Sequence, residues 1–189
     1  MESLNDIQNP ENPAPETIIA SLRDIEVMHY GFDGEIHTGR IIMHEAVADD
    51  IQAFFAHAYE LGFPIAKVVP IHDSAYAWSD ERSSEDNNSS GFNYRQVTGN
   101  PTKISWHGYG RAFDINPLQN MYVNYDEKLE ERYRIPKNGT HDETLPGTLF
   151  ADHALVRFMK DRGWIWGGDW TPASGRTDWQ HFEKPDSFA

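Results

Sequence analysis

The sequence predicts a single α+β domain in which helices flank a central antiparallel sheet. Three observations lead to this expectation. The chain has 189 residues, which is near the size of one domain. Short extended segments are interspersed with two amphipathic helical patterns. No internal repeat of a solenoid or propeller period is visible, so the elements belong to one core.

The first elements are an arm and a hairpin. Residues 1–15 are polar, contain three prolines and lack periodicity, so we expect an arm or linker that adds little to the core. We place the end of this arm at residue 23 and a single domain over residues 24–189. Residues 24–44 hold two extended segments separated by Asp33 and Gly34, a dipeptide typical of a β-hairpin turn.

A helix, a strand and a long loop are expected next. The apolar residues of the segment IQAFFAHAYELG, which begins at Ile51, fall on one helical face, and Gly62 and Pro64 end the helix. Residues 65–71 predict a short buried strand. Residues 72–91 are polar and charged, so we expect a surface loop that forms no core.

The remaining elements are shorter. Residues 92–97 predict a strand, and residues 124–147 are charged and interrupted by proline and glycine, which indicates a surface excursion. A second amphipathic helix is expected over residues 148–162, before Gly163. Two further short strands are expected from the segments WIW and WQHFE.

Composition excludes several classes of function. Thirty acidic against sixteen basic residues give a net charge of −14, so binding to nucleic acid or to an anionic membrane is disfavoured by repulsion. No run approaches the roughly 18 apolar residues of a membrane span. The first residues lack the pattern of a secretory signal, so we expect either no export by that route or a leader already removed. Because cysteine is absent, any metal must be held by His and carboxylate groups.

Two clusters combine His with a carboxylate. His107 and Asp114 are seven residues apart, with Gly108, Gly110 and Ala112 between them to permit a tight turn. Asp178 and His181 are three apart, a spacing that brings both side chains to one ion only if a turn or bulge interrupts the strand. Spacing alone leaves open both a metal site and ordinary hydrogen-bonded polar residues.

The first hypothesis has a defined chemistry. Two His nitrogens and one Asp oxygen leave a fourth position free, as in catalytic zinc sites. A water bound at this fourth position could attack a peptide bond if a further carboxylate beside it accepted its proton. Such an arrangement would form the active site of a hydrolase. Asp178 is the candidate for this group, with Glu183 behind it.

The two clusters together resemble a known family. The residues Ser105, His107, Gly110, Ala112 and Asp114, followed by DWQHFE over 178–183, are similar to the paired signature of the zinc DD-peptidases of family M15. This family includes vancomycin-resistance D-Ala-D-Ala carboxypeptidases and dipeptidases and phage L-Ala-D-Glu endolysins. SGFNYR, INPLQNMYV and WGGDW extend the resemblance over residues 40–185, and it is strongest to the carboxypeptidase-like branch.

The resemblance implies a Hedgehog/DD-peptidase-like fold and a set of roles. His107, Asp114 and His181 would bind Zn²⁺, Asp178 would be the catalytic base, and Arg95 would polarise the scissile carbonyl or stabilise its oxyanion. Some relatives carry Glu in place of Asp178, and the branch often has Cys where this chain has Tyr94. The N-terminal arm and the loop over residues 72–91 have no counterpart in the family.

Three further residues are candidates for substrate binding. Trp166 is expected in the wall of the pocket, although clustered aromatic residues are equally typical of core. Asp169 could bind a substrate ammonium or cap a turn, and Ser105 could contact a ligand or form a local Ser turn. The other seven His lack a second ligand in a recognisable motif.

These observations lead to a functional expectation. The chain is expected to be a monomeric zinc peptidase that acts on the cell envelope and hydrolyses a D-amino-acid-containing bond of peptidoglycan stem peptides, in the first place as a D-Ala-D-Ala carboxypeptidase. Two alternatives remain at this point. One is a phage-type L-Ala-D-Glu endolysin, and the other is a non-catalytic module that keeps zinc and binds wall peptides.

Overall fold

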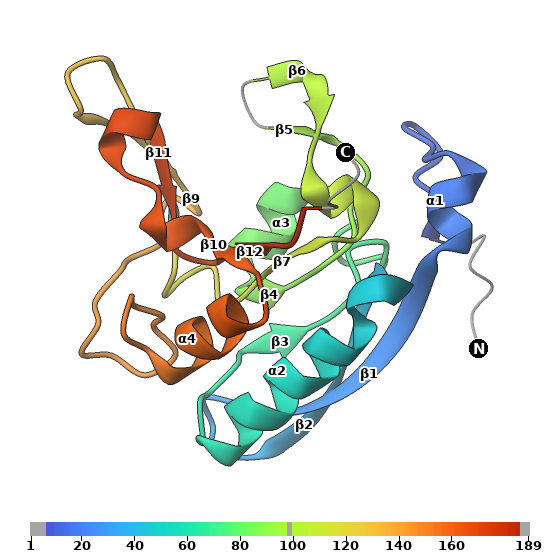
Figure 1. Ribbon diagram of the computed structural model, residues 1–189, viewed down its shortest axis with the longest axis horizontal. Helices are drawn as coiled ribbons and strands as arrows, with labels where there is room; N and C mark the ends of the chain where they lie inside the picture. Colours follow the sequence, from blue (N-terminus) through green and yellow to red (C-terminus); the bar gives the residue numbers. More distant parts are fainter. Residues whose placement is uncertain (1–6, 98–99, 186–189) are drawn as a thin grey trace.

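The computed structural model describes residues 7–97 and 100–185 and combines helices with many short strands. A long hairpin with a helix packed on it forms one part of the molecule, and several small sheets stand on the other side of that helix (Figure 1). This agrees with the expected mixture of helices and strands.

The hairpin is the longest strand pair. β1 (Leu22–Tyr30) and β2 (Ile36–His44) pair antiparallel along their full length. Gly34 adopts a φ of +80° in the connecting turn, and Asp33 accepts a hydrogen bond from the backbone N–H of Glu35. The hairpin predicted from the Asp-Gly dipeptide is confirmed.

Helix α2 (Ala48–Glu60) covers this hairpin and follows a 3₁₀ turn, η2 (Glu45–Val47). Asp49 and Asp50 lie in its first turn, where their negative charges interact favourably with the positive end of the helix dipole. Gly62 follows its end with a φ of +64°, as expected for a glycine after a helix. No helix among the described residues has the length and apolar character needed to cross a membrane.

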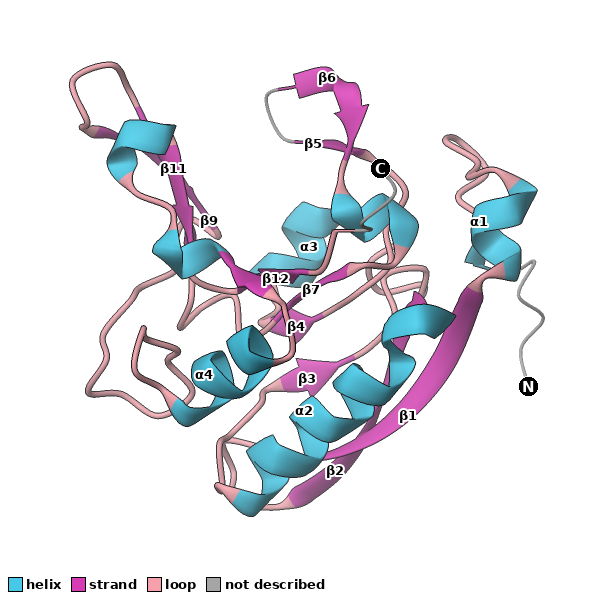
Figure 2. Cartoon of the chain, in the orientation of Figure 1, coloured by secondary structure: helices cyan, strands magenta, loops and turns pink. Residues whose placement is uncertain are grey.

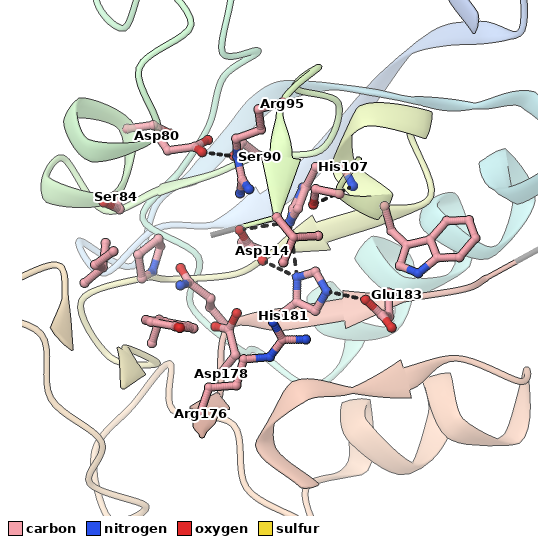
Figure 3. A pocket seen from close by; sticks show the side chains of 18 of the residues that line it. Asp80, Ser84, Ser90, Arg95, His107, Asp114, Arg176, Asp178, His181 and Glu183 are labelled. Carbon is pink, nitrogen blue, oxygen red and sulfur yellow. Dashed lines mark hydrogen bonds and ion pairs between the residues drawn. The ribbon is translucent and has the colours of Figure 1, made fainter. Parts of the chain in front are cut away.

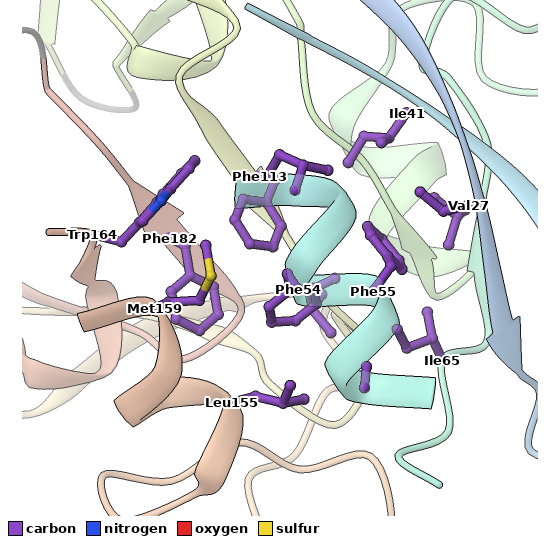
Figure 4. Close-up of a cluster of buried hydrophobic side chains, with 14 of the residues drawn as sticks. Val27, Ile41, Phe54, Phe55, Ile65, Phe113, Leu155, Met159, Trp164 and Phe182 are labelled. Atoms are coloured by element: carbon purple, nitrogen blue, oxygen red, sulfur yellow. The ribbon is translucent and has the colours of Figure 1, made fainter. Parts of the chain in front are cut away.

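The core surrounds two rings of α2, Phe54 and Phe55. Figure 4 shows them between the hairpin on one side and an aromatic group on the other, with Val27, Ile41 and Ile65 facing Phe113, Trp164 and Phe182. Phe113 and Phe182 stack at 5.2 Å between ring centroids, and Phe54 meets Phe113 edge-on at 5.1 Å. Helix α4 (Ala154–Asp161) closes this core.

The strands beyond the hairpin form small sheets rather than the expected central sheet. Two sheets have three strands, in the orders β10-β12-β7 and β11-β8-β9, and the pairs β3-β4 and β5-β6 stand alone. Among the strand pairs of the described residues, β3-β4 alone is parallel. The strands are β3 (Lys67–Val68), β4 (Asn88–Ser89), β5 (Gln96–Val97), β6 (Asn100–Ile104), β7 (Ala112–Asp114), β8 (Tyr122–Tyr125), β9 (Glu131–Ile135), β10 (Ile165–Trp166), β11 (Arg176–Asp178) and β12 (His181–Glu183).

The segment over residues 72–91 is not the coreless loop that its composition predicts. It contains α3 (Asp80–Glu85) and β4, and Ser83, Asn88 and Ser89 are buried. Burial is possible because the side chains replace backbone partners: Asn88 accepts from the N–H of Val69 and donates to its carbonyl oxygen. The prediction of a surface loop was therefore wrong for this part of the segment, because its polar side chains are buried and hydrogen-bonded.

Two other boundaries differ from expectation. The excursion over residues 124–147 includes the β8–β9 hairpin, and its Ile135–Pro136 peptide bond is cis. The second helix begins at Ala154 instead of residue 148, because His153 caps it by accepting a hydrogen bond from the N–H of Leu155.

The N-terminal segment contributes more to packing than its prolines suggest. Helix α1 (Glu16–Ala20) precedes β1, and the residues Ile7, Ala14 and Ile19 join Leu22, Ile42 and Phe92 in a second buried cluster. Trp78 donates a hydrogen bond from Nε1 to the carbonyl oxygen of Ile7. The segment therefore packs against the domain, and the boundary at residue 23 stays a prediction.

Candidate active site

Three short elements bring two His and one Asp together. His107 lies in the 3₁₀ turn η3 (Trp106–Tyr109), Asp114 ends β7 and His181 begins β12. Asp114 and His181 are directly paired across the antiparallel strands. One ligand atom from each of the three residues lies within 4.8 Å of the others, so the group could hold a metal ion (Figure 3).

The individual distances are shorter than this limit. His107 Nε2 is 3.1 Å from His181 Nδ1 and 3.3 Å from Asp114 Oδ2, and His181 Nδ1 is 3.0 Å from Asp114 Oδ1. Both rings are buried, with exposed fractions of 4% for His107 and 6% for His181. Two imidazole nitrogens and a carboxylate oxygen suit zinc, which prefers nitrogen with some oxygen when thiolates are absent.

The outer nitrogen of each ring is held by an acceptor. His107 Nδ1 donates to the carbonyl oxygen of Gly91 over 2.7 Å, and His181 Nε2 donates to Glu183 Oε2 over 3.0 Å. These contacts orient the rings so that His107 Nε2 and His181 Nδ1 face the cluster, which is the usual arrangement behind metal-binding His. Glu183 thus lies behind His181, on the side away from the cluster.

The turn that carries His107 depends on small residues. Ser105 caps it, since its Oγ accepts from the N–H of His107 over 3.3 Å. Gly110 adopts a φ of +65°, and a Cβ there would lie 2.7 Å from the backbone nitrogen of His44. Ser105 thus forms a local Ser turn in this structure, and it also lines the pocket.

Asp178 approaches the cluster from a separate strand. β11 ends at Asp178 and β12 begins at His181, so the intervening Trp179 and Gln180 form the turn that the spacing of three requires. Gly167 permits this approach, because a Cβ there would lie 2.5 Å from the carbonyl oxygen of Asp178. The Oδ1 atom of Asp178 is buried and has no hydrogen-bond partner among the described residues.

Burial sets the charge states in this pocket. It raises the pKa of Asp178 to about 6, with the nearby Asp114 adding to the shift and His181 opposing it. Burial would lower the pKa of His181, but its hydrogen bonds to Asp114 and Glu183 outweigh this and raise that pKa to about 10. The pKa of Asp114 is lowered, since the attraction of His107 and His181 exceeds the cost of burial. A metal ion at this cluster would therefore displace a proton from His181.

Arg95 reaches the same pocket from the segment before β5. Its Nε forms an ion pair with Asp80 Oδ2 at the start of α3, and Asp80 Oδ1 also accepts from Asn93 Nδ2 over 2.7 Å. Asp80 thus positions the guanidinium. The sequence did not reveal this role, because the contact depends on how α3 and β4 fold between Asp80 and Arg95.

The cavity joins these groups in about 340 Å³. The predicted residues Arg95, Ser105, His107, Asp114, Asp178 and His181 line it. Two predicted substrate contacts lie elsewhere: Trp166 is 2% exposed within the core and donates from Nε1 to Trp179, and Asp169 forms an ion pair with Lys160. Trp170 and Arg176 line the cavity instead. The sequence could have predicted that Arg176 lines the cavity, because Arg176 precedes Asp178 by two residues and the two side chains lie on the same face of a strand.

Comparison with known proteins agrees with this geometry. Residues 98–184 match the family model described as D-alanyl-D-alanine carboxypeptidase, a span that contains His107, Asp114, Asp178 and His181 but not Arg95. Searches of curated proteins and of solved structures found no match. The matched span covers a little under half of the chain, and it supports the similarity to the M15 peptidases that the two motifs indicate.

Proposed function

We propose that this peptidase is a zinc-dependent D-Ala-D-Ala carboxypeptidase that acts on peptidoglycan stem peptides. The observation that carries the proposal is Asp178, which lines a cavity beside the cluster of His107, Asp114 and His181. Its buried Oδ1 has no hydrogen-bond partner among the described residues. A buried carboxylate oxygen without a partner is costly, and such oxygens are found where they meet a ligand or a reacting group.

The metal ligands in this proposal are His107, Asp114 and His181. Zinc bound there would supply Lewis-acid assistance to the attacking water and to the scissile carbonyl. Gly91 and Glu183 keep the two rings in the orientation that binding needs.

Asp178 moves the proton. It accepts a proton from the attacking water while the water oxygen bonds to the carbonyl carbon, and it returns that proton to the leaving amine as the C–N bond breaks. A pKa of about 6 suits both steps, because the group is ionised near neutral pH yet binds a proton without a large penalty.

Arg95 assists at the carbonyl oxygen. Its guanidinium lines the cavity, and the ion pair with Asp80 restricts where it can point. Directed donors that meet a developing oxyanion lower the barrier without reorganising during the reaction.

The test is Asp178→Asn, assayed on a defined pentapeptide ending in D-Ala-D-Ala, with products identified by mass. We expect zinc content to stay near one per chain while hydrolysis falls at least ~10²-fold, the lower range for a positioned base. The wild-type product should be the tetrapeptide and free D-Ala.

Other products would separate the alternatives. Cleavage between L-Ala and D-Glu would indicate an endolysin-type peptidase. Tight peptide binding without turnover by the zinc-loaded wild type would indicate a binding module. Full activity of the Asp178→Asn variant would remove Asp178 from the role of base.

A further inference from the structure

A second arginine stands beside the proposed base. Arg176 and Asp178 are both on β11, and because side chains alternate along a strand, they project from the same face with Cα atoms about 7 Å apart. Figure 3 shows both side chains directed toward the cluster of His and Asp. Arg176 is partly buried and lines the same cavity.

The guanidinium of Arg176 is held by an aromatic ring. Its Cζ lies 4.3 Å from the centre of the Trp170 ring. A cation over an aromatic ring is attracted by the ring without using its N–H donors in hydrogen bonds, so those donors stay available to an anion. An arginine supported in this way can present two parallel donors to a carboxylate.

Arg176 also lacks an anionic partner. Within residues 7–97 and 100–185, no carboxylate lies within 4.0 Å of its guanidinium, although its charge helps to lower the pKa of Glu183. Arg95, by contrast, is paired with Asp80. Lys103 is exposed on the β5–β6 ribbon, which stands at the top of Figure 2, apart from β11.

We propose that Arg176 binds the terminal carboxylate of the substrate and so restricts the site to peptides with a free C-terminus. The inference rests on the proposed carboxypeptidase function. In such a substrate only the amide nitrogen and one Cα separate the scissile carbonyl from the carboxylate. A base and a carboxylate anchor must therefore be close neighbours, as Asp178 and Arg176 are on β11.

The pocket would otherwise repel that carboxylate. Asp114, Asp178 and Glu183 all line it, and only a cation that is not already neutralised can offset their effect on an anionic substrate. Arg176 meets this condition and is also fixed in direction by Trp170.

The experiment compares two peptides that differ in one group, a terminal D-Ala carboxylate or the corresponding carboxamide. The zinc-loaded wild type should prefer the acid. In Arg176→Gln, kcat/KM for the acid should fall ~10- to 100-fold, the range for losing a hydrogen bond to a charged group, and kcat/KM for the amide should change little. The preference should therefore collapse. Arg176→Lys should keep part of it, since charge remains without the forked donors.

Lys103→Gln is the matched control, because it removes the same charge from another side of the cavity. It should leave the ratio of the two substrates unchanged. Zinc content and melting temperature of each variant show whether the fold is retained.

The outcomes are distinct. A wild type that cleaves both peptides equally overturns the role of Arg176 while leaving the peptidase in place, and this result needs no variant. An equal loss on both peptides in Arg176→Gln, or a collapsed preference in Lys103→Gln alone, also overturns it. A wild type that cleaves neither peptide overturns the proposed function and this inference together.

Discussion

The two sides of the pocket are supported in different ways. On β7 and β12, each proposed ligand is next to a fully buried ring, since Phe113 precedes Asp114 and Phe182 follows His181. On β11 the residue between Arg176 and Asp178 is Thr177, whose Oγ1 donates to the carbonyl oxygen of Trp170 over 2.8 Å. The ligands are thus backed by the hydrophobic core, and the opposite side is backed by backbone pairing and polar contacts.

This difference indicates a division of roles. Close-packed aromatic rings resist displacement, so the ligand positions are fixed by the fold itself. The side formed by β11 and by Arg95 with Asp80 can change without disturbing that core. Changes to the ligand strands should affect metal content and stability, whereas changes to the opposite side should affect catalysis and substrate choice.

The largest effect is expected from removing a ligand. His107→Ala and His181→Ala should each lose most of the zinc, because a site left with two protein ligands cannot compete with buffer. Metal content is measured after dialysis, with the Asp178→Asn protein as the matched control that should retain zinc. An unchanged zinc content in both His variants would contradict the assignment of these residues as ligands.

The next largest effect is expected on the free energy of unfolding, which should fall more for a substitution behind the ligand strands than for one on the opposite side. Phe182→Ala removes a buried ring from the core behind His181 and should lower the free energy of unfolding by about 3–5 kcal/mol. Tyr133→Ala on β9, where the ring is 40% exposed, should cost roughly 0.5 kcal/mol. Urea unfolding of the metal-free proteins measures both, and comparable losses would contradict the division.

The same division explains what the sequence could predict. The hairpin, α2 and the tight turn at His107 follow from local patterns, since Asp-Gly, a helical apolar face and spaced glycines act within a few residues. The proposed ligand set was likewise indicated by two short motifs, and the turn at Trp179 and Gln180 supplies the irregularity that the spacing required.

The missed features depend on contacts between distant residues. The burial of Asn88 rests on its bonds to Val69, and the support of Arg95 rests on Asp80 in a segment that composition alone assigns to a loop. Trp166 was expected in the wall and lies in the core, because its ring packs with the aromatic group and only the neighbouring Trp170 reaches the cavity. Strands of two or three residues are also too short for periodicity to identify.

Arg95→Lys is expected to have a smaller effect, confined to catalysis. Lys keeps the charge but loses the planar fork, so kcat and kcat/KM should fall together by roughly 10-fold while KM moves little. Steady-state kinetics on one defined stem peptide measures this, with equal zinc occupancy in both proteins. A change in KM alone would show that Arg95 grips the substrate carboxylate, and this would also weigh against Arg176 in that role.

The smallest effect concerns His153, on the core side of the molecule and away from the pocket. Burial lowers its pKa from the ordinary value near 6.5, and the charges of Arg157 and His57 lower it further. Neutral His153 caps α4 by accepting from the N–H of Leu155, and a protonated ring at that position can no longer accept.

The sign of the pH effect follows from these two states. Well above pH 6.5 the ring is neutral in the folded and the unfolded chain, so its contribution is complete. As the pH falls below 6.5, the unfolded chain binds the proton first and stability declines. The loss should approach that of a missing helix cap, about 1 kcal/mol.

His153→Asn keeps a capping acceptor that does not titrate, so its urea unfolding should depend less on pH between 7 and 5 than that of the wild type. Identical pH dependence of the two proteins would show that His153 does not carry this part of the stability.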